Sequence, residues 1–157
     1  MLVDDLHRCA YRMGHLLARQ WWRLRRPESR GVAVAVWSAG RLLVVRPSYR
    51  RGYDLPGGGL DAGEEPRRGA ARELAEELAV ELPTAELQDL GLFDFTLEHR
   101  RIRETLFAWH PLVEPALRID RREIVWAGFL PPTELHRAAV TPSVRHALHR
   151  PPALTGR

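Results

Sequence analysis

Residues 55–80, LPGGGLDAGEEPRRGAARELAEELAV, constrain the fold most strongly, because a glycine-rich loop runs directly into an acidic helical pattern. On a helix, residues three and four positions apart lie on one face. Glu73, Glu76 and Glu77 therefore share a face, where like charges repel one another unless a cation neutralises them. Carboxylate oxygens are ligands that Mg²⁺ and Mn²⁺ prefer. The stretch predicts a site for a divalent metal and a diphosphate.

The opposite face of this helix is mostly apolar, which predicts that it packs on a core while the acids point outward. Its members are Arg67, Ala70, Ala71, Leu74, Ala75 and Leu78. Pro66 suits the first helical position, and Glu65 stands where Ser or Thr usually caps a helix. Gly69 lies on the acidic side, where a glycine costs roughly 1 kcal/mol relative to alanine. Its placement predicts that a bulky group needs the room.

This stretch resembles the signature of the Nudix hydrolases in residue type and spacing. The resemblance rests on Gly58, Glu64 and the segment RELAEELAV, which covers residues 72–80. One position departs from the family pattern, because Ala79 replaces the usual glycine. A residue just past a helix end often adopts the left-handed conformation, where alanine costs on the order of 1 kcal/mol. The departure bears on stability more than on chemistry.

The resemblance implies an α/β/α sandwich with a mixed sheet, and we assign residues 28–157 to this Nudix hydrolase domain. Residue patterns agree with that order of elements. Alternating apolar residues bounded by turn signals predict strands, and prolines mark two helix starts. The expected strands cover residues 31–37, 41–46, 90–97, 105–113 and 124–129, a loop covers 98–103, a short helix covers 133–139, and Thr141 with Pro142 caps a final helix.

The family also implies an activity, which is hydrolysis of a diphosphate linkage in a nucleoside diphosphate derivative with Mg²⁺ or Mn²⁺. Glu73, Glu76 and Glu77 would be catalytic residues and metal ligands, aided by a backbone carbonyl of Gly57 or Gly58. The general base is left open between Glu73 and Glu76.

Several other residues receive roles from the resemblance. Arg72 would pair with Glu64 and fix the loop against the helix. Glu123 is the candidate for a fourth carboxylate near the metal. Its rivals, at the ends of other predicted elements, are Glu98, Glu104 and Glu114.

Arginines surround the predicted site. Arg46, Arg50 and Arg51 lie just before the glycines, and guanidinium groups match phosphate oxygens well, so they are candidate substrate contacts. The basic residues of the predicted loop 98–103 are further candidates, although charged loop residues are usually solvated. Residues 42–56 and 95–98 match no substrate-specific pattern of the family, so a nucleoside di- or triphosphate is expected, with a capped RNA end as an alternative.

Three other functions compete with hydrolysis. Residues 57–62 satisfy the dinucleotide fingerprint G-x-G-x-x-A, but Glu64 and Glu65 at the helix start would repel a pyrophosphate. A prenyl diphosphate isomerase would need a catalytic cysteine in the core, where Cys9 does not lie. A non-catalytic module that senses nucleotides or binds a membrane or partner is the main alternative, and the intact acids argue against it.

Residues 1–27 form a predicted amphipathic helix outside the usual Nudix core. Apolar residues recur there at three- and four-residue steps, and six basic residues lie on the other side. The helix either covers the domain's own sheet or a homodimer interface, or it lies on a membrane surface. Its arginines interrupt any span of apolar residues long enough to cross a membrane.

Composition excludes further chemistry. Every basic residue other than histidine is arginine, which rules out a Walker-type phosphate loop, a Schiff-base lysine and a Ser-Lys dyad. The net charge of +4 reflects arginine usage and predicts no specific nucleic acid. The single cysteine, Cys9, forbids an internal disulfide, which fits a cytoplasmic protein. The alternative is a protein that associates with a membrane through residues 1–27.

Overall fold

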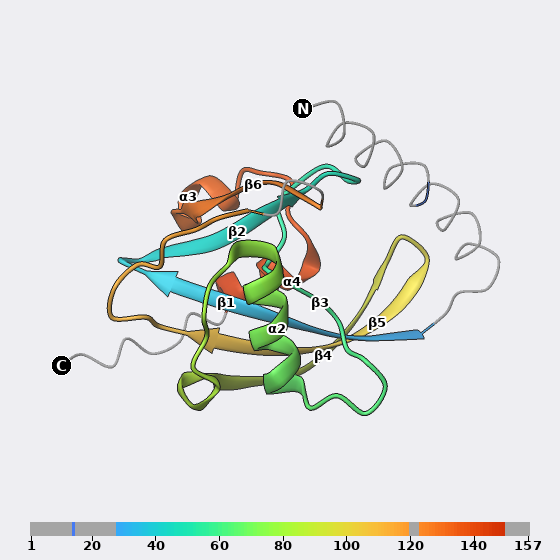
Figure 1. Ribbon diagram of the computed structural model, residues 1–157. Coiled ribbons are helices and arrows are strands. Elements are labelled where there is room, and N and C mark those ends of the chain that lie inside the picture. Colours follow the sequence, from blue (N-terminus) through green and yellow to red (C-terminus); the bar gives the residue numbers. More distant parts are fainter. Residues whose placement is uncertain (1–13, 15–27, 120–122, 150–157) are drawn as a thin grey trace.

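The computed structural model describes residues 28–119 and 123–149, together with Gly14. Helices lie on both faces of a mixed sheet, which confirms the predicted α/β/α sandwich (Figure 1). The helix predicted over residues 1–27 lies outside the described residues apart from Gly14.

The sheet is organised around β1, which pairs with β5 along one edge and with β3 and then β2 along the other. The strands are β1 Glu28–Ser38, β2 Arg41–Pro47, β3 Gly57–Gly59, β4 Gln88–Leu97, β5 Arg100–Trp109 and β6 Ile124–Leu130. Their order is β4-β5-β1-β2-β6, with β3 paired to β1 beside this path. β1 runs parallel to β5, whereas β2 and β3 pair antiparallel with its end and its start. The glycine strand β3 therefore lies beside the first half of β1.

Helix α2, Pro66–Leu78, covers one face of the sheet, while α3, Pro132–Leu135, and α4, Pro142–His149, lie on the other face (Figure 1). A short 3₁₀ turn, η1, covers Thr84–Glu86. Alternate residues of β1 point to opposite faces, as a strand requires. Its three valines join the apolar cluster under α2, and its two alanines with Trp37 join the cluster under α4.

Three predicted boundaries were wrong. The loop expected over residues 98–103 is a tight turn at Glu98 and His99, whose φ angles are 50° and 70°, and β5 already begins at Arg100. The arginines concealed the strand, although Ile102 is buried between exposed Arg101 and Arg103. The helix expected over 133–139 is limited to α3, and β5 ends at Trp109 rather than at residue 113.

The ends of α2 explain how it forms despite its unusual caps. The Glu65 side chain accepts hydrogen bonds from the backbone N–H of Arg67 and Arg68, both at 3.0 Å, so a glutamate supplies the cap. Ala79 ends the helix in the left-handed conformation, with φ 54° and ψ 35°, as expected. Ala75, which the sequence placed on the core face, is exposed. The buried side chains of that face are those of Ala70, Leu74 and Leu78.

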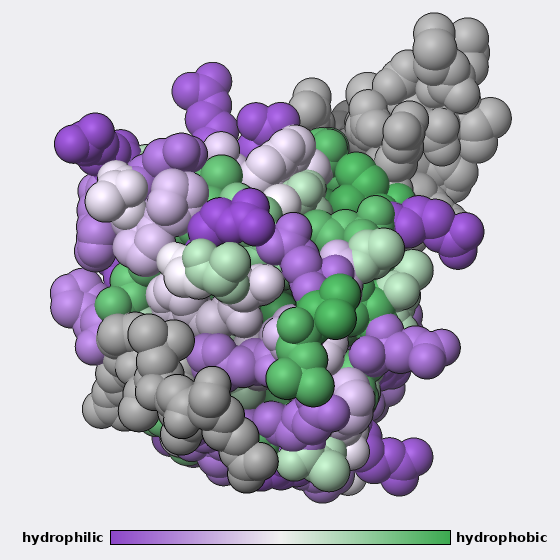
Figure 2. All heavy atoms as spheres, turned by 90° about the vertical axis from the view of Figure 1, so that its left-hand side faces the viewer, coloured by the Kyte–Doolittle hydropathy of each residue, from purple (hydrophilic) through white to green (hydrophobic). Residues whose placement is uncertain are grey.

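The molecular surface mixes charged and apolar areas. On the side shown in Figure 2, hydrophobic patches interrupt a mainly hydrophilic surface. Large exposed apolar residues are Leu92 in β4 and Leu112 and Val113 after β5. No helix in the described part of the chain is both long and apolar enough to cross a membrane.

Candidate functional site

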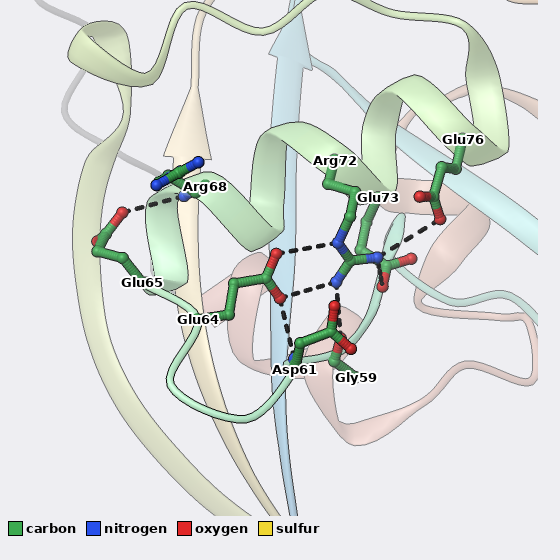
Figure 3. A network of polar contacts seen from close by, with 8 residues as sticks. All are labelled: Gly59, Asp61, Glu64, Glu65, Arg68, Arg72, Glu73 and Glu76. Atoms are coloured by element: carbon green, nitrogen blue, oxygen red, sulfur yellow. Dashed lines mark hydrogen bonds and ion pairs between the residues drawn. The ribbon is translucent and has the colours of Figure 1, made fainter.

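Arg72 connects α2 to the loop that follows β3 (Figure 3). Its guanidinium donates to both carboxylate oxygens of Glu64 at 2.9 Å and to the carbonyl of Gly59 at 3.0 Å. It also donates to Glu73 at 2.9 Å and, at a longer 3.4 Å, to Glu76. These hydrogen bonds from Arg72 lower the pKa of Glu64 to about 2. The predicted pairing of Arg72 with Glu64 is present, and it fixes the loop against the helix.

The glycines of β3 allow a very close approach between β1 and α2. A Cβ at Gly58 would lie 2.6 Å from Oε1 of Glu73, and one at Gly57 would lie 2.2 Å from the carbonyl oxygen of Val32. Either contact is too short for a side chain. The N–H of Gly57 donates to Oε2 of Glu77 at 3.1 Å, so β3 also anchors one of the acids.

Gly69 makes room in the same way, which explains its position in mid-helix. A Cβ there would lie 2.4 Å from Cδ2 of Leu60 and 3.2 Å from Oε2 of Glu64. The bulky group predicted at this position is therefore the Leu60 side chain of the loop.

The acidic residues of α2 differ in their surroundings, and the expectation that all of them point outward was wrong. Glu76 is mainly solvated, with a side chain that is 62% exposed, whereas that of Glu73 is 13% exposed. Burial, opposed by the N–H of Gly57, raises the pKa of Glu77 to about 8. Burial also raises the pKa of Glu73, and repulsion by Glu123 adds to the increase at both residues. Glu123 therefore lies near the acids of α2.

One cavity of about 370 Å³ joins these groups. Its polar lining includes Glu73, Glu76, Glu77, Glu123 and the three glycines of β3. A set of carboxylates and backbone carbonyls suits a hard divalent cation, and a cation would relieve the repulsion that raises the pKa of Glu77. In residues 28–119 and 123–149, no three acidic, histidine or cysteine side chains are already gathered around one point. The carboxylate and carbonyl oxygens are suitable metal ligands. In this structure Glu73 and Glu76 accept hydrogen bonds from Arg72.

The predicted arginine contacts divide between two cavities. Arg50 lines the cavity of the carboxylates and forms an ion pair with Asp54. Arg46 and Arg51 do not reach that lining. Together with Arg50 they line a second, more open cavity of about 1140 Å³, beside Tyr49 and Glu98.

The basic residues of the β4–β5 turn are also separated. Arg100 lines the carboxylate cavity. Arg103 instead pairs with Asp94 of β4, and Arg101 pairs with Glu28 of β1. Of the rivals to Glu123, Glu104 lines the cavity, whereas Glu114 forms an exposed ion pair with Arg41.

Sequence reasoning missed several polar residues of the cavity, among them Tyr49 and Ser143. Tyr49 is half-buried beside the basic loop, and burial raises the pKa of its hydroxyl. Ser143, in the first turn of α4, is buried and hydrogen-bonds the carboxyl of Glu104. A serine in a first helical turn looks like a cap, so its sequence position gave no sign of the contact.

Comparisons with known proteins show the family and the fold of this chain. A family model, the NUDIX domain, matches residues 27–150. An octanoyltransferase of Myxococcus xanthus is 31% identical over 119 residues, which cover 71% of this chain and 33% of that protein. A MutT-like protein of Streptomyces ambofaciens is 41% identical over 54 residues, which cover 34% of this chain and 35% of that protein. The chain thus spans about a third of the length of either relative.

Solved structures show the same fold. The crystal structure of a MutT NUDIX hydrolase from Burkholderia pseudomallei superposes on this chain with a TM-score of 0.70 at 21% identity. The match covers 80% of this chain and 98% of that one.

Proposed function

The chain belongs to the Nudix family, and from this we propose that it is a pyrophosphohydrolase that cleaves a diphosphate linkage in a nucleoside diphosphate derivative with Mg²⁺ or Mn²⁺. One observation carries the proposal. A single cavity joins the glycine strand β3 to Glu73, Glu76, Glu77 and Glu123, with Arg50 at its wall. Acidic groups gathered beside a guanidinium suit a substrate that brings phosphate groups and a cation together.

We assign the metal to the carboxylates of Glu73, Glu76, Glu77 and Glu123, with a carbonyl of Gly57 or Gly58. When bound, a divalent cation neutralises phosphate charge and lowers the pKa of a coordinated water. Burial and the negative charges of Glu73 and Glu123 oppose ionisation of Glu77. A cation bound nearby would favour the ionised carboxylate.

The chain's own groups position the substrate and accept the proton. Arg50 is held in place by Asp54 and supplies a fixed guanidinium for a phosphate oxygen. A water attacks phosphorus, the anhydride P–O bond breaks, and the leaving phosphate departs with the bonding electrons. The water proton passes to a carboxylate. Glu76 suits this role better than Glu73, because it is more exposed and only weakly held by Arg72.

A substrate panel tests the proposal. The full-length protein is incubated with nucleoside di- and triphosphates, nucleotide sugars and ADP-ribose in the presence of Mg²⁺, and release of phosphate, pyrophosphate or nucleoside monophosphate is measured. We expect turnover of at least one class and a loss on the order of 100-fold or more in Glu76→Gln. Glu81→Gln, an exposed acid just after α2, is the matched control and should retain activity.

Two outcomes would overturn the proposal. If Glu76→Gln matched the wild type, hydrolysis would not use this residue. If no compound turned over while a nucleotide still bound, the chain would act as the non-catalytic sensing module.

A further inference from the structure

Glu104 has no part in the proposed hydrolysis, although it lines the same cavity. It lies in β5, opposite Phe93 of β4 and Gly31 of β1. The hydroxyl of Ser143 hydrogen-bonds its carboxyl, while Oε2 is enclosed and has no hydrogen-bond partner. Buried polar atoms nearly always have partners, because leaving one unpaired is costly. An unpaired buried oxygen in a residue that lines a cavity points to a ligand.

The position of Glu104 separates it from the acids assigned to the metal. Repulsion by Glu123, and not by Glu104, is among the leading causes that raise the pKa values of Glu73 and Glu77. The charged residue that acts on Glu104 is Arg50, whose guanidinium lowers its pKa against the larger effect of burial. Glu104 shares its side of β5 with Leu106, which packs in the apolar cluster under α4, whereas the acids of α2 assigned to the metal belong to the helix on the other face of the sheet.

Apolar side chains of β4 and β5 lie beside Glu104. Residues directly opposite one another in paired strands point to the same side of the sheet. The pair Phe95 and Ile102 therefore lies next to the pair Phe93 and Glu104, and Leu97 follows. Phe95, Leu97 and Ile102 all line the cavity, as does Gly31, which lies opposite Glu104 in β1. Apolar walls with a few convergent polar groups are typical of a ligand pocket, and Arg50, Arg100 and Ser143 line this cavity together with Glu104.

We propose that Oε2 of Glu104 is the hydrogen-bonding anchor for the nucleobase of the substrate, which lies against Phe95, Leu97 and Ile102. The inference rests on the proposed function, since it takes the substrate to carry a nucleoside. As a carboxylate the group accepts from an N–H of the base, and as an acid it donates to a ring nitrogen or a carbonyl. Glu104 is thus a specificity residue for the moiety beyond the phosphates.

Binding of non-hydrolysable probes tests the assignment without requiring turnover. The α,β-methylene diphosphates of adenosine, guanosine, cytidine and uridine are compared with ribose 5-α,β-methylene diphosphate, which has no base, by calorimetry with Mg²⁺. For the best nucleoside, Glu104→Leu should weaken binding about tenfold, the usual effect of one buried hydrogen bond, and should leave the abasic probe unchanged. Glu104→Gln keeps a polar group of the same shape and should retain most of the affinity. Glu81→Leu is the control.

The results separate the two proposals. If the wild type binds nucleosides through Glu104 but hydrolyses nothing, the proposed function fails and the anchor stands. If the wild type hydrolyses nucleotides while Glu104→Leu weakens the abasic probe equally, or weakens no probe, the anchor is overturned. Thermal unfolding of each variant confirms that the affinities refer to folded protein.

Discussion

Arg72 determines the local geometry of the site, because one guanidinium contacts the loop after β3 and two acids of α2. Its fork matches the two oxygens of Glu64 and still reaches the carbonyl of Gly59. A lysine carries the same charge but only a single donor centre, so it cannot make these contacts together. The residue acts through the groups that it positions.

We therefore expect Arg72→Lys to lower kcat/KM by about 10- to 100-fold, the usual effect of losing a group that orients metal ligands. The melting temperature should also fall. The control is Arg68→Lys on the same helix, because Arg68 is exposed and contacts Glu65 through its backbone N–H. Steady-state kinetics and thermal unfolding measure both effects, and equal behaviour of the two variants would contradict the role of the fork.

The single residue Glu104 should make the stability of the protein depend on pH. Burial raises its pKa from 4.5 to about 7. The folded state then binds this proton more tightly than the unfolded state, so the contribution of Glu104 to stability falls as the pH rises from about 4.5 to about 7. The full penalty is on the order of 3 kcal/mol.

Glu104→Gln removes this titration. We expect the free energy of unfolding of Glu104→Gln, measured by urea denaturation, to exceed that of the wild type. The difference should grow from about pH 4.5 to about pH 7 and then level off. Glu81→Gln should follow the wild-type curve. Parallel curves for wild type and Glu104→Gln would show that the carboxyl titrates normally.

At the scale of elements, α2 places the acids, and its C-terminal end contains a correctable defect. Ala79 holds a left-handed conformation, with φ 54°, in which alanine is strained and glycine is not. Ala79 is exposed, so its methyl group contributes no core packing. The backbone hydrogen bonds from Ala79 to Ala75 and from Val80 to Leu74 close the helix despite this strain.

Ala79→Gly should therefore stabilise the protein by about 1 kcal/mol, which is a rise of roughly 2–4 °C in melting temperature for a chain of this size. Ala75→Gly is the matched control, because it introduces glycine at an exposed position inside the same helix. That change should destabilise by about 1 kcal/mol. Calorimetry measures both, and a loss of stability in Ala79→Gly would contradict the account of the cap.

The whole molecule brings together acids that repel one another. Glu77 lies on a helix packed against one face of the sheet, whereas Glu123 immediately precedes β6. Packing forces these charges into one cavity, and the resulting burial and repulsion oppose ionisation of Glu77. The favourable packing of the fold therefore offsets the electrostatic cost of holding these acids close together.

Removal of the metal tests this balance. Saturating Mg²⁺ or Mn²⁺ should raise the melting temperature above the value in EDTA. At a metal concentration of 100 times the Kd, the free energy of unfolding should increase by roughly 2.7 kcal/mol. Glu77→Gln should be more stable than the wild type in EDTA at pH 8 and should gain less from the metal. The control is Glu134→Gln, an exposed acid of α3. Identical metal responses in wild type and Glu77→Gln would contradict the assignment.

The sequence by itself determined the family, the sandwich fold and the shared face of Glu73, Glu76 and Glu77, because helical spacing and local turn chemistry depend on residues close together in the chain. The pairing of Arg72 with Glu64 also followed, since loop and helix are adjacent. The start of β5 was missed because arginines on its solvent face resemble a loop, while Ile102 alone signals the buried side.

Only the tertiary structure decided which distant residues share the cavity. Packing brings Glu123, Arg50, Glu104 and Ser143 to the glycine strand, and it excludes Arg46, Arg51 and Glu114. These positions depend on strand register and on the approach of β3 to β1, which are set by contacts between residues far apart in the chain. Burial, and hence the pKa of each acid, follows from the same packing, so local sequence determines the chemical groups while long-range packing determines their environment.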